Sequence, residues 1–563
     1  MSGAAEERGL DPDLLAAVAA LGVLGLLLFT AAQRVAHPFD LEWMEGGMLV
    51  HAERVRRGLP LYVAPSADFV PFIYPPLTHW LLGLWGKLAG VDYLWGRLLS
   101  LLGSLAAAGA AVAALRQEGA RWGLALAAGG LFLSTYEDVG TFFDLVRTDG
   151  LFIGLLSWAL VRARSGGPVS AGLLLAAAFM AKHNGAAFGL PILVWLWLER
   201  GRAEAQRFAA ASVLPALLFL GLMMAEGDGL FLTYLLAVPA AHPIVGDRVF
   251  PGTFVELLSA LPLSGGLLLA AVALRARAGG WARPADLRPW GAALLGIGAL
   301  GAVVGVKTMG IQTPLGAALP AVAGGGVVLA GLVVLALLNL SRAGAPRAPA
   351  AGDRYWLWAG ALAVALSALM RGHHGGFLNV LMPGMWALAV GGALALHRMR
   401  AAGGPRWAPL VGALALAGQL GADLWDPADK APRPEDRAAG EALVARLKAE
   451  PGAVWAPASP WLAVQAGKEP GTHLIALWDV NHKGGALASG IKPVKEALAA
   501  HRWALIVGHE TRPDQDLGGW GLQAHYRKAE DLTPPGPALT PRVGWRARPR
   551  RAWRPKVEAN PGE

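Results

Sequence analysis

The chain alternates between long apolar runs and short clusters of charged residues. Many of the runs span roughly 18–22 residues, the length with which a helix crosses the hydrocarbon core of a bilayer. The pattern predicts an all-α polytopic membrane protein with about 13 transmembrane helices. The apolar segments lie near residues 14–33, 95–115, 122–136, 148–161, 169–182, 186–198, 208–225, 253–274, 289–306, 319–340, 355–370, 377–396 and 407–422.

Composition supports membrane insertion. Of the 563 residues, 55% are hydrophobic and only 16% are charged, whereas a soluble domain carries about a quarter charged residues. The first apolar run lacks a small-x-small cleavage site, so we interpret it as a retained anchor rather than a signal peptide. The chain has no cysteine, which excludes disulfides, thiolate nucleophiles and cysteine-ligated metals.

The arginines indicate orientation in the membrane. The net charge is +9, and basic loops of a membrane protein report sidedness rather than nucleic-acid binding. With a cytoplasmic N-terminus, every inside loop carries at least two arginines: 116–121, 162–166, 199–207, 275–288, 342–354 and 397–406. We therefore predict a multi-pass protein of the plasma or inner membrane, in contact with membrane lipids, whose C-terminal part is extracytoplasmic.

Two regions lie outside the predicted membrane helices of the N-terminal domain, residues 1–422. The first outer loop, 34–94, is expected to hold an amphipathic helix on the membrane surface over 43–58 and a short interfacial helix over 77–90. Residues 423–563 alternate between a helical pattern at 435–450 and strand-like runs at 453–457, 473–480 and 503–508, which predicts a small α/β domain. The basic tail, 545–556, is expected to be disordered and to touch anionic lipid headgroups.

Ionisable residues gather at the predicted outer ends of several spans. Ionisable groups near the hydrocarbon are costly, and they tend to be paired or functional. Glu42 and Glu45 are three residues apart and share one face of a helix. The clusters are Asp40, Glu42 and Glu45; Asp144, Arg147 and Asp149; Lys182 and His183; and Arg371, His373, His374 and Asn379.

These residue types suit a reaction between a hydroxyl and a lipid-linked phosphate. A carboxylate accepts the hydroxyl proton as general base, and arginine or lysine stabilises the departing phosphate. Taken singly, each residue also fits a structural role. Asp144 and Arg147 fit a local ion pair, and His373 and His374 fit a hydrogen-bonded loop better than a metal site.

The chain resembles the GT-C glycosyltransferases of the dolichyl-phosphate-mannose–protein mannosyltransferase and lipid A aminoarabinose transferase type. The resemblance covers roughly residues 14–400. It rests on the acidic first outer loop, on GLPLY at 58–62, on PPLTHW at 75–80 and on DLVRTD at 144–149. The expected topology, with an outside C-terminal domain, also agrees with that family.

The resemblance implies inverting transfer of a sugar from a polyprenyl-phosphate donor to an acceptor at the outer face. It makes Glu45 the candidate base, ahead of Glu42 and Asp149. Met44 stands where the family often has Asp, and Tyr74 stands where the aminoarabinose type has Lys. The donor-binding candidates are Arg147, Lys182, Arg371 and Tyr74. Further site candidates are Asp144, His183, His373, His374 and Asn379.

Two other functions are compatible with the composition. A secondary transporter is expected to show internal repeats and charges near the midplane, and neither is evident in the sequence. A non-catalytic membrane assembly protein that docks through its C-terminal domain is the other alternative. The sequence names no acceptor, implies no cofactor and gives no support for a divalent metal.

Overall fold

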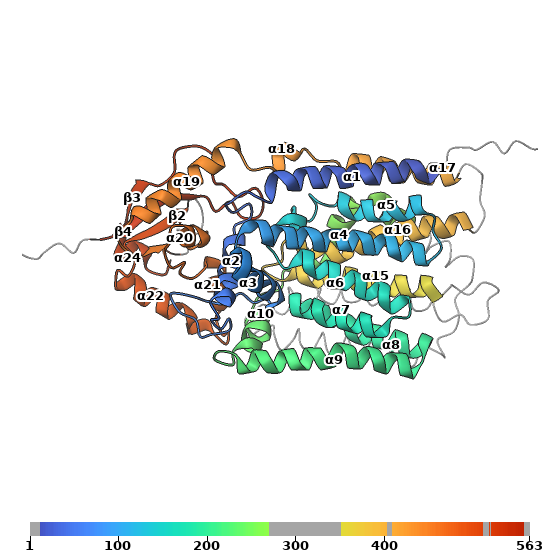
Figure 1. Ribbon diagram of the computed structural model, residues 1–563, viewed down its shortest axis with the longest axis horizontal. Helices are drawn as coiled ribbons and strands as arrows, with labels where there is room; N and C mark the ends of the chain where they lie inside the picture. Colours follow the sequence, from blue (N-terminus) through green and yellow to red (C-terminus); the bar gives the residue numbers. More distant parts are fainter. Residues whose placement is uncertain (1–11, 269–350, 402–407, 510–516, 518, 557–563) are drawn as a thin grey trace, which may run out of the picture.

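The computed structural model describes residues 12–268, 351–401, 408–509, 517 and 519–556. In Figure 1 the long helices of the N-terminal part lie side by side and roughly parallel, and the C-terminal domain packs against one end of this bundle. Helix α1 begins at the far end of the bundle and runs toward the C-terminal domain. Arg34, at the end of α1, donates a 2.7 Å hydrogen bond to the carbonyl oxygen of Lys430, which lies in the C-terminal part of the chain.

Helices form where the apolar segments predict them. The segments 289–306 and 319–340 lie outside the described residues, as does 253–274 beyond residue 268. The helices of the N-terminal part are α1 (Pro12–Arg34), α2 (Glu45–Arg56), α3 (Leu77–Ala89), α4 (Tyr93–Gln117), α5 (Trp122–Ser134), η1 (Phe142–Asp144), α6 (Asp149–Arg164), α7 (Pro168–Ala181), η2 (His183–Phe188), α8 (Gly189–Arg200), α9 (Arg202–Ala225), η3 (Thr233–Ala237), α10 (Val238–Ala240), η4 (Arg248–Gly252), α11 (Thr253–Ala260), α15 (Ala351–Gly372), η6 (Leu378–Leu381), α16 (Met382–Ala401) and α17 (Ala408–Ala422).

Several of these helices suit a bilayer. In the part of the chain that the structure describes, four are long and apolar enough to cross one: Asp13–Arg34, Tyr93–Gln117, Arg202–Ala225 and Leu378–Arg398. Helix α9 leaves Leu214, Leu217 and Leu218 exposed, as expected of a face in contact with lipid. The total of about 13 spans stays a prediction.

Small residues bring α4 and α6 into close contact. A side-chain carbon added to Gly103 of α4 would lie 2.2 Å from the carbonyl oxygen of Gly150 in α6. Small residues allow such backbone approach between membrane helices. Ser100 Oγ, one turn earlier on α4, donates a 2.9 Å hydrogen bond to the carbonyl oxygen of Arg147. The α4–α6 contact therefore fixes the polar loop that precedes α6.

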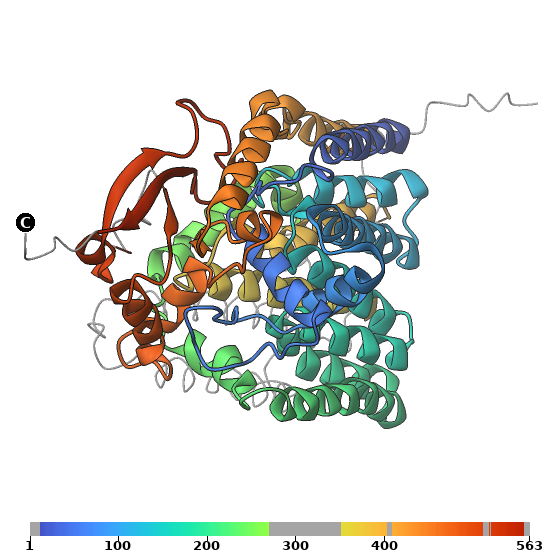
Figure 2. The ribbon, with the colours of Figure 1, turned by 60° about the vertical axis from the view of Figure 1, so that its left-hand side comes forward.

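The predicted first outer loop, 34–94, lies at the junction between the bundle and the C-terminal domain (Figures 1 and 2). Helix α2 is buried at every position from Glu45 to Glu53, so the expectation of a helix lying on the membrane surface is wrong. Helix α2 packs mainly against α3, and it also contacts α4 of the bundle and α20 (Trp461–Gln465) of the C-terminal domain. Helix α3 does expose an apolar face, formed by Leu84, Trp85 and Leu88.

The C-terminal residues form helices around a four-stranded sheet of order β1-β2-β4-β3. Strand β1 is parallel to β2, and β4 is antiparallel to both β2 and β3. The elements are α18 (Pro427–Lys430), α19 (Pro434–Ala449), β1 (Val454–Trp455), α20, α21 (Leu474–Val480), η7 (Ala488–Ile491), α22 (Lys492–Ala499), β2 (Leu505–His509), α24 (Leu522–His525), β3 (Tyr526–Asp531) and β4 (Pro549–Pro555).

Two expectations for this domain are wrong. The run 473–480 is helix α21 rather than a strand. Leu474, Leu477 and Val480 bury one helical face, and the His473 side chain accepts a hydrogen bond from the amide of Ile475 at the helix start.

The basic tail is also not a disordered segment, because β4 is an inner strand of the sheet. Its charges have partners within the domain. Arg554 pairs with Glu450 and Glu530, and Arg551 pairs with Asp531. These pairs neutralise the arginines that were expected to bind lipid headgroups.

Replacing Gly103 by Ala is expected to destabilise the protein. The new methyl group would overlap the backbone of α6, and overpacking of this kind typically costs about 1–3 kcal/mol. Gly109 lies on the same helix with nothing within 4 Å of an added carbon, so Gly109→Ala is the matched control. Thermal unfolding in detergent should show a lower midpoint for Gly103→Ala only. Equal midpoints for the two variants would contradict the close helix contact.

Candidate active site

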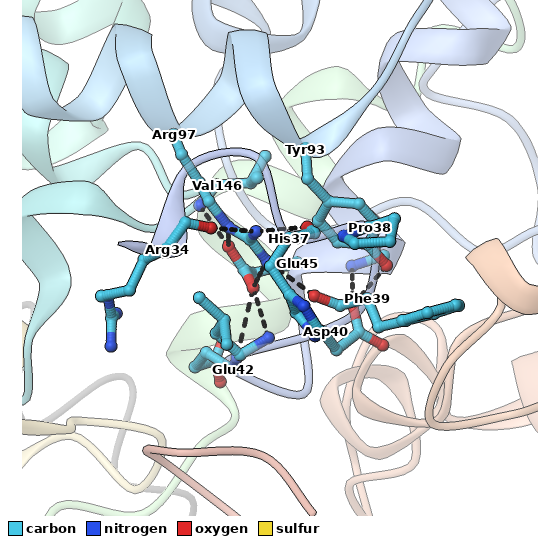
Figure 3. A network of polar contacts seen from close by, with 12 residues as sticks. Arg34, His37, Pro38, Phe39, Asp40, Glu42, Glu45, Tyr93, Arg97 and Val146 are labelled. Atoms are coloured by element: carbon cyan, nitrogen blue, oxygen red, sulfur yellow. Dashed lines mark hydrogen bonds and ion pairs between the residues drawn. The ribbon is translucent and has the colours of Figure 1, made fainter. Parts of the chain in front are cut away.

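A buried ion pair between Glu45 and Arg97 organises the polar end of the bundle (Figure 3). Both side chains are fully buried. Glu45 Oε1 accepts hydrogen bonds from Arg97 Nε at 2.9 Å and from the amide of Val146 at 2.8 Å. Glu45 Oε2 accepts from Arg97 Nη2 at 2.8 Å and from the amide of Leu41 at 2.7 Å. Every oxygen of this carboxylate is therefore occupied.

The surroundings of Glu45 favour its charged form. Burial alone raises the pKa of a carboxyl group, but here the Arg97 charge and the amide donors outweigh burial and hold the pKa of Glu45 below its usual range. Arg97 also donates to the carbonyl oxygens of Arg34, His37 and Phe39, at 2.6–2.9 Å. A carboxylate held this way is suited to fixing the loop and unsuited to accepting a proton.

Asp144 forms a second buried ion pair. Its Oδ2 accepts a 2.7 Å hydrogen bond from Arg34 Nε, and its Oδ1 accepts a 3.0 Å bond from the Tyr136 hydroxyl. The local pair with Arg147 that the sequence suggested does not form. Arg34, 110 residues away in the chain, takes that place and leaves Arg147 to other partners.

Arg147 reaches instead to Glu42 and Tyr74. Its Nη1 donates to Glu42 Oε2 at 3.1 Å and contacts Met44 Sδ at 2.7 Å, and its Nη2 donates to the Tyr74 hydroxyl at 3.0 Å. Its Nε is buried and has no hydrogen-bond partner among the described residues. Among the described residues, the Arg147 guanidinium thus keeps one unused donor, the Nε–H group, beside the Glu42 carboxyl group and the Tyr74 phenol.

The pKa values in this group differ from those of free side chains. Burial raises the pKa of Glu42 to about 7, although the Arg147 charge opposes the shift. Burial likewise raises the pKa of Tyr74 to about 12, which keeps the phenol protonated at neutral pH. A carboxyl group that titrates near pH 7 is matched to general-base work.

A second polar group surrounds Asp149 at the start of α6. Lys182 Nζ donates to Asp149 Oδ1 at 2.6 Å, and Asn379 Nδ2 donates to the same oxygen at 2.9 Å. Asp149 Oδ2 is buried and, within the described ranges, accepts no hydrogen bond. These three side chains line a small pocket together with Phe152, Asn184, Leu366, Met370, Val380, Met382 and Pro383. The structure thus brings together residues from three of the predicted clusters.

The remaining predicted residues have other partners than Glu42 in the described part of the chain. Arg371 forms a bidentate ion pair with Glu256, with Nη2 to Oε1 at 2.7 Å, so its fork of donors is already used. His373 shares a 3.1 Å hydrogen bond with His242. The His374 ring lies 6.0 Å from that of His482, and His183 follows Lys182 with its Nδ1 buried.

The C-terminal domain borders the site. Val543 forms a β-bridge with Glu42. Gly544 follows with φ of +72°, and a side-chain carbon there would lie 3.0 Å from Glu42 Oε1. Asp479 of α21 is close enough to Arg147 to sense its charge. Across the described ranges, no group of three or more histidine, aspartate or glutamate side chains is arranged to hold a metal ion.

Sequence reasoning missed Arg97, Arg34 and Asp479. Arg97 carried a usable signal, because an arginine within the apolar run 95–115 demands a partner. Arg34 stands at the end of the first run and carried a weaker signal of the same kind. No sequence pattern pointed to Asp479, because only the folded C-terminal domain brings it to the site.

The chain is similar to two solved structures. No protein-family model and no curated protein matches the chain. Among solved structures, ArnT from Cupriavidus metallidurans in the apo state aligns at 15% identity with a TM-score of 0.46, covering 95% of this chain and 97% of that chain. The ArnT structure bound to undecaprenyl phosphate aligns at 14% identity with a TM-score of 0.44, covering the same shares.

Glu45→Gln is expected to impair folding rather than chemistry alone. An amide cannot accept all of these hydrogen bonds and leaves the buried Arg97 charge uncompensated, and breaking such a pair typically costs about 3–5 kcal/mol. Glu441→Gln is the control, because Glu441 pairs with Arg437 on the exposed surface. Unfolding midpoints and expression levels should fall for Glu45→Gln only. Wild-type stability of Glu45→Gln would contradict the structural role.

Proposed function

We propose that the protein is an integral membrane glycosyltransferase of the GT-C type. It transfers a sugar from a polyprenyl-phosphate donor to an acceptor hydroxyl, with inversion at the anomeric carbon. The observation that carries the proposal is the buried Arg147, which contacts Glu42 and Tyr74 and keeps Nε without a partner within the described ranges. Arginine binds phosphate oxygens through such a fork of donors.

The depth of the site fits a lipid-linked donor. Asp149 begins α6 and Lys182 follows the end of α7, while Arg147 contacts Glu42, which forms a β-bridge with Val543 of the C-terminal domain. A polyprenyl chain stays in the hydrocarbon while its phosphate remains in the headgroup layer. The side chains that act on the donor must therefore lie at the depth of the headgroups. The donor is of the same lipid class as the undecaprenyl phosphate bound in one of the similar ArnT structures.

Each side chain has a role in the proposed reaction. The acceptor oxygen forms a bond to the anomeric carbon while the bond from that carbon to the phosphate oxygen breaks. Glu42 takes the hydroxyl proton, and polyprenyl phosphate leaves with the bonding electron pair. Arg147 and Lys182 stabilise the phosphate charge, and Asp149, assisted by Asn379, holds Lys182 in place.

This assignment moves the base from Glu45 to Glu42. The sequence favoured Glu45 through the family resemblance, but the hydrogen bonds of Glu45 are complete and its pKa is lowered. Glu42 has a raised pKa and contacts the cation proposed to bind the donor. Arg371 is left out of the donor site because it pairs with Glu256.

The proposed orientation places the N-terminus in the cytoplasm and the C-terminal domain outside the cell membrane. The chain has no cysteine, so single cysteines report sidedness directly. Lys448→Cys on the exposed face of α19 should react in intact cells with a membrane-impermeant maleimide. Gln206 is exposed near the start of α9, and α9 begins at the end of the bundle away from the C-terminal domain (Figure 1). Gln206→Cys should therefore react only after permeabilisation. The reverse labelling pattern would overturn the orientation.

Glu42→Gln is expected to lower sugar transfer by about 10²–10⁴, because the amide keeps the size of the side chain but accepts no proton. The assay measures radiolabelled sugar released from a polyprenyl-phosphate donor and recovered on an acceptor. Glu469→Gln, with a side chain 77% exposed, is the matched control and should retain wild-type transfer. Transfer within a few-fold of wild type in a folded Glu42→Gln protein would remove Glu42 from the proposed role.

The pH profile gives a separate test. The base works when deprotonated, so kcat/KM should rise as pH increases through about 7, the pKa of Glu42, and level off above it. Arg147→Gln removes the cation that lowers this pKa, and the rising limb should therefore move to higher pH. Arg57→Gln is the control. Arg57 pairs with Glu53 and Glu469, so its replacement should leave the rising limb of the pH profile unchanged. A flat profile between pH 5 and 9 in the wild type would contradict the assignment.

A further inference from the structure

Three tryptophans meet where the first outer loop touches the C-terminal domain. Trp43 follows Glu42 in the loop, Trp478 lies on α21, and Trp545 precedes β4. The ring centroids of Trp43 and Trp478 are 5.6 Å apart, those of Trp43 and Trp545 are 5.1 Å apart, and those of Trp478 and Trp545 are 4.9 Å apart. We call these three residues the tryptophan cluster.

The tryptophan cluster is only partly closed, because Trp43 is buried with the core while the other two rings are not. The C-terminal domain has a core pair, Trp455 and Trp503, whose rings stack at 4.4 Å and are almost fully buried. In contrast, Trp478 and Trp545 are each partly exposed. The cluster also differs from an aromatic belt at a lipid surface, since its rings pack on one another at a domain junction. Trp85 of α3 is the belt-like residue, with 44% exposure on an apolar helix face.

The backbone links the tryptophan cluster to the proposed base. Trp43 is the direct neighbour of Glu42. On the other side, Val543 forms the β-bridge with Glu42, and Gly544, which packs against the Glu42 carboxylate, directly precedes Trp545. Aromatic surface from two domains therefore lies beside the carboxylate that is proposed to deprotonate the acceptor.

A polar rim accompanies the aromatic surface. Asp479 follows Trp478, with a side chain 15% exposed, and burial raises its pKa to about 8 although the Arg147 charge opposes the shift. His242 Nε2 lies 2.8 Å from the Asp479 carbonyl oxygen and fixes this end of α21 to the bundle. Indole rings with a few fixed polar groups form the general pattern of a binding site. The apolar C–H face of a pyranose stacks on indole while its hydroxyls bind carboxylates.

We propose that the tryptophan cluster and Asp479 form the acceptor subsite and that the acceptor is a saccharide. The inference rests on the proposed function, because it names the acceptor class for the same site. A pyranose ring stacked on Trp478 and Trp545 places a neighbouring hydroxyl toward Glu42. The C-terminal domain thereby selects the acceptor, while the membrane helices hold the donor.

The test measures saccharide binding and sugar transfer separately, on the full-length protein in lipid nanodiscs. The binding probes are cellotetraose and chitotetraose, followed by saturation-transfer-difference NMR. Saturable binding is expected for at least one probe. Trp478→Ala and Trp545→Ala should weaken it at least tenfold, while Trp545→Phe should retain most of it. Trp520→Ala is the matched control, since Trp520 is partly exposed on the same domain and lies outside the tryptophan cluster.

In the transfer assay, Trp478→Ala and Trp545→Ala should raise KM for a saccharide acceptor at least tenfold and leave KM for the donor unchanged. Saccharide binding without any transfer by the wild type would support the subsite and contradict the proposed function. Transfer with an unchanged acceptor KM in both folded alanine variants would contradict the subsite and leave the proposed function standing. Absence of saturable binding to both probes would also overturn the subsite.

Discussion

The arrangement of the site depends on the buried Arg97–Glu45 ion pair. Removing two charges from water is expensive, and an interior pair is stable only when hydrogen bonds occupy the remaining donors and acceptors. Here the partners of the two side chains include backbone groups at the end of α1, in the first loop and at Val146. One interaction therefore ties together segments that are far apart in the sequence. The ion pair also positions Glu42 and Arg147. Glu42 stands three residues before Glu45, and Arg147 directly follows Val146, whose amide donates to Glu45.

The acids at this end of the bundle have different roles because their surroundings differ. Glu45 and Asp144 face arginines inside the protein and act as structural anions. Asp149 accepts from Lys182 and Asn379 and fixes a cation beside the pocket. Glu42 combines deep burial with one arginine that is shared with Tyr74 and Met44, so its charge is only partly compensated. The different roles proposed for these acids follow from how far neighbouring positive charges compensate the charge of each carboxylate.

The sequence predicted the helices of the described apolar segments, and four of these helices are long and apolar enough to cross a bilayer, because the length needed for crossing is visible directly in an apolar run. It also predicted that Glu42, Arg147, Asp149 and Lys182 share one end of the bundle, and the structure brings them there. It failed where long-range contacts decide the outcome. Spacing suggested an Asp144–Arg147 pair, but Arg34 from another helix takes Asp144.

The same limit explains the errors outside the bundle. The basic tail looked free because its acidic partners, Glu450, Glu530 and Asp531, lie elsewhere in the chain. Helix α2 looked like a surface helix because the domain that covers it begins hundreds of residues later. The choice between Glu42 and Glu45 needed the hydrogen-bond partners of each carboxylate, which local sequence does not contain.

We propose that Arg147 and Lys182 receive the phosphate of a polyprenyl-phosphate lipid beside Glu42. The most direct test of this proposal is an electron cryomicroscopy map of the protein in nanodiscs with added polyprenyl phosphate. We expect phosphate density within hydrogen-bonding distance of Arg147 Nε, with the lipid chain running between the apolar helices. A phosphate bound elsewhere, with the Arg147 contacts unchanged, would contradict it.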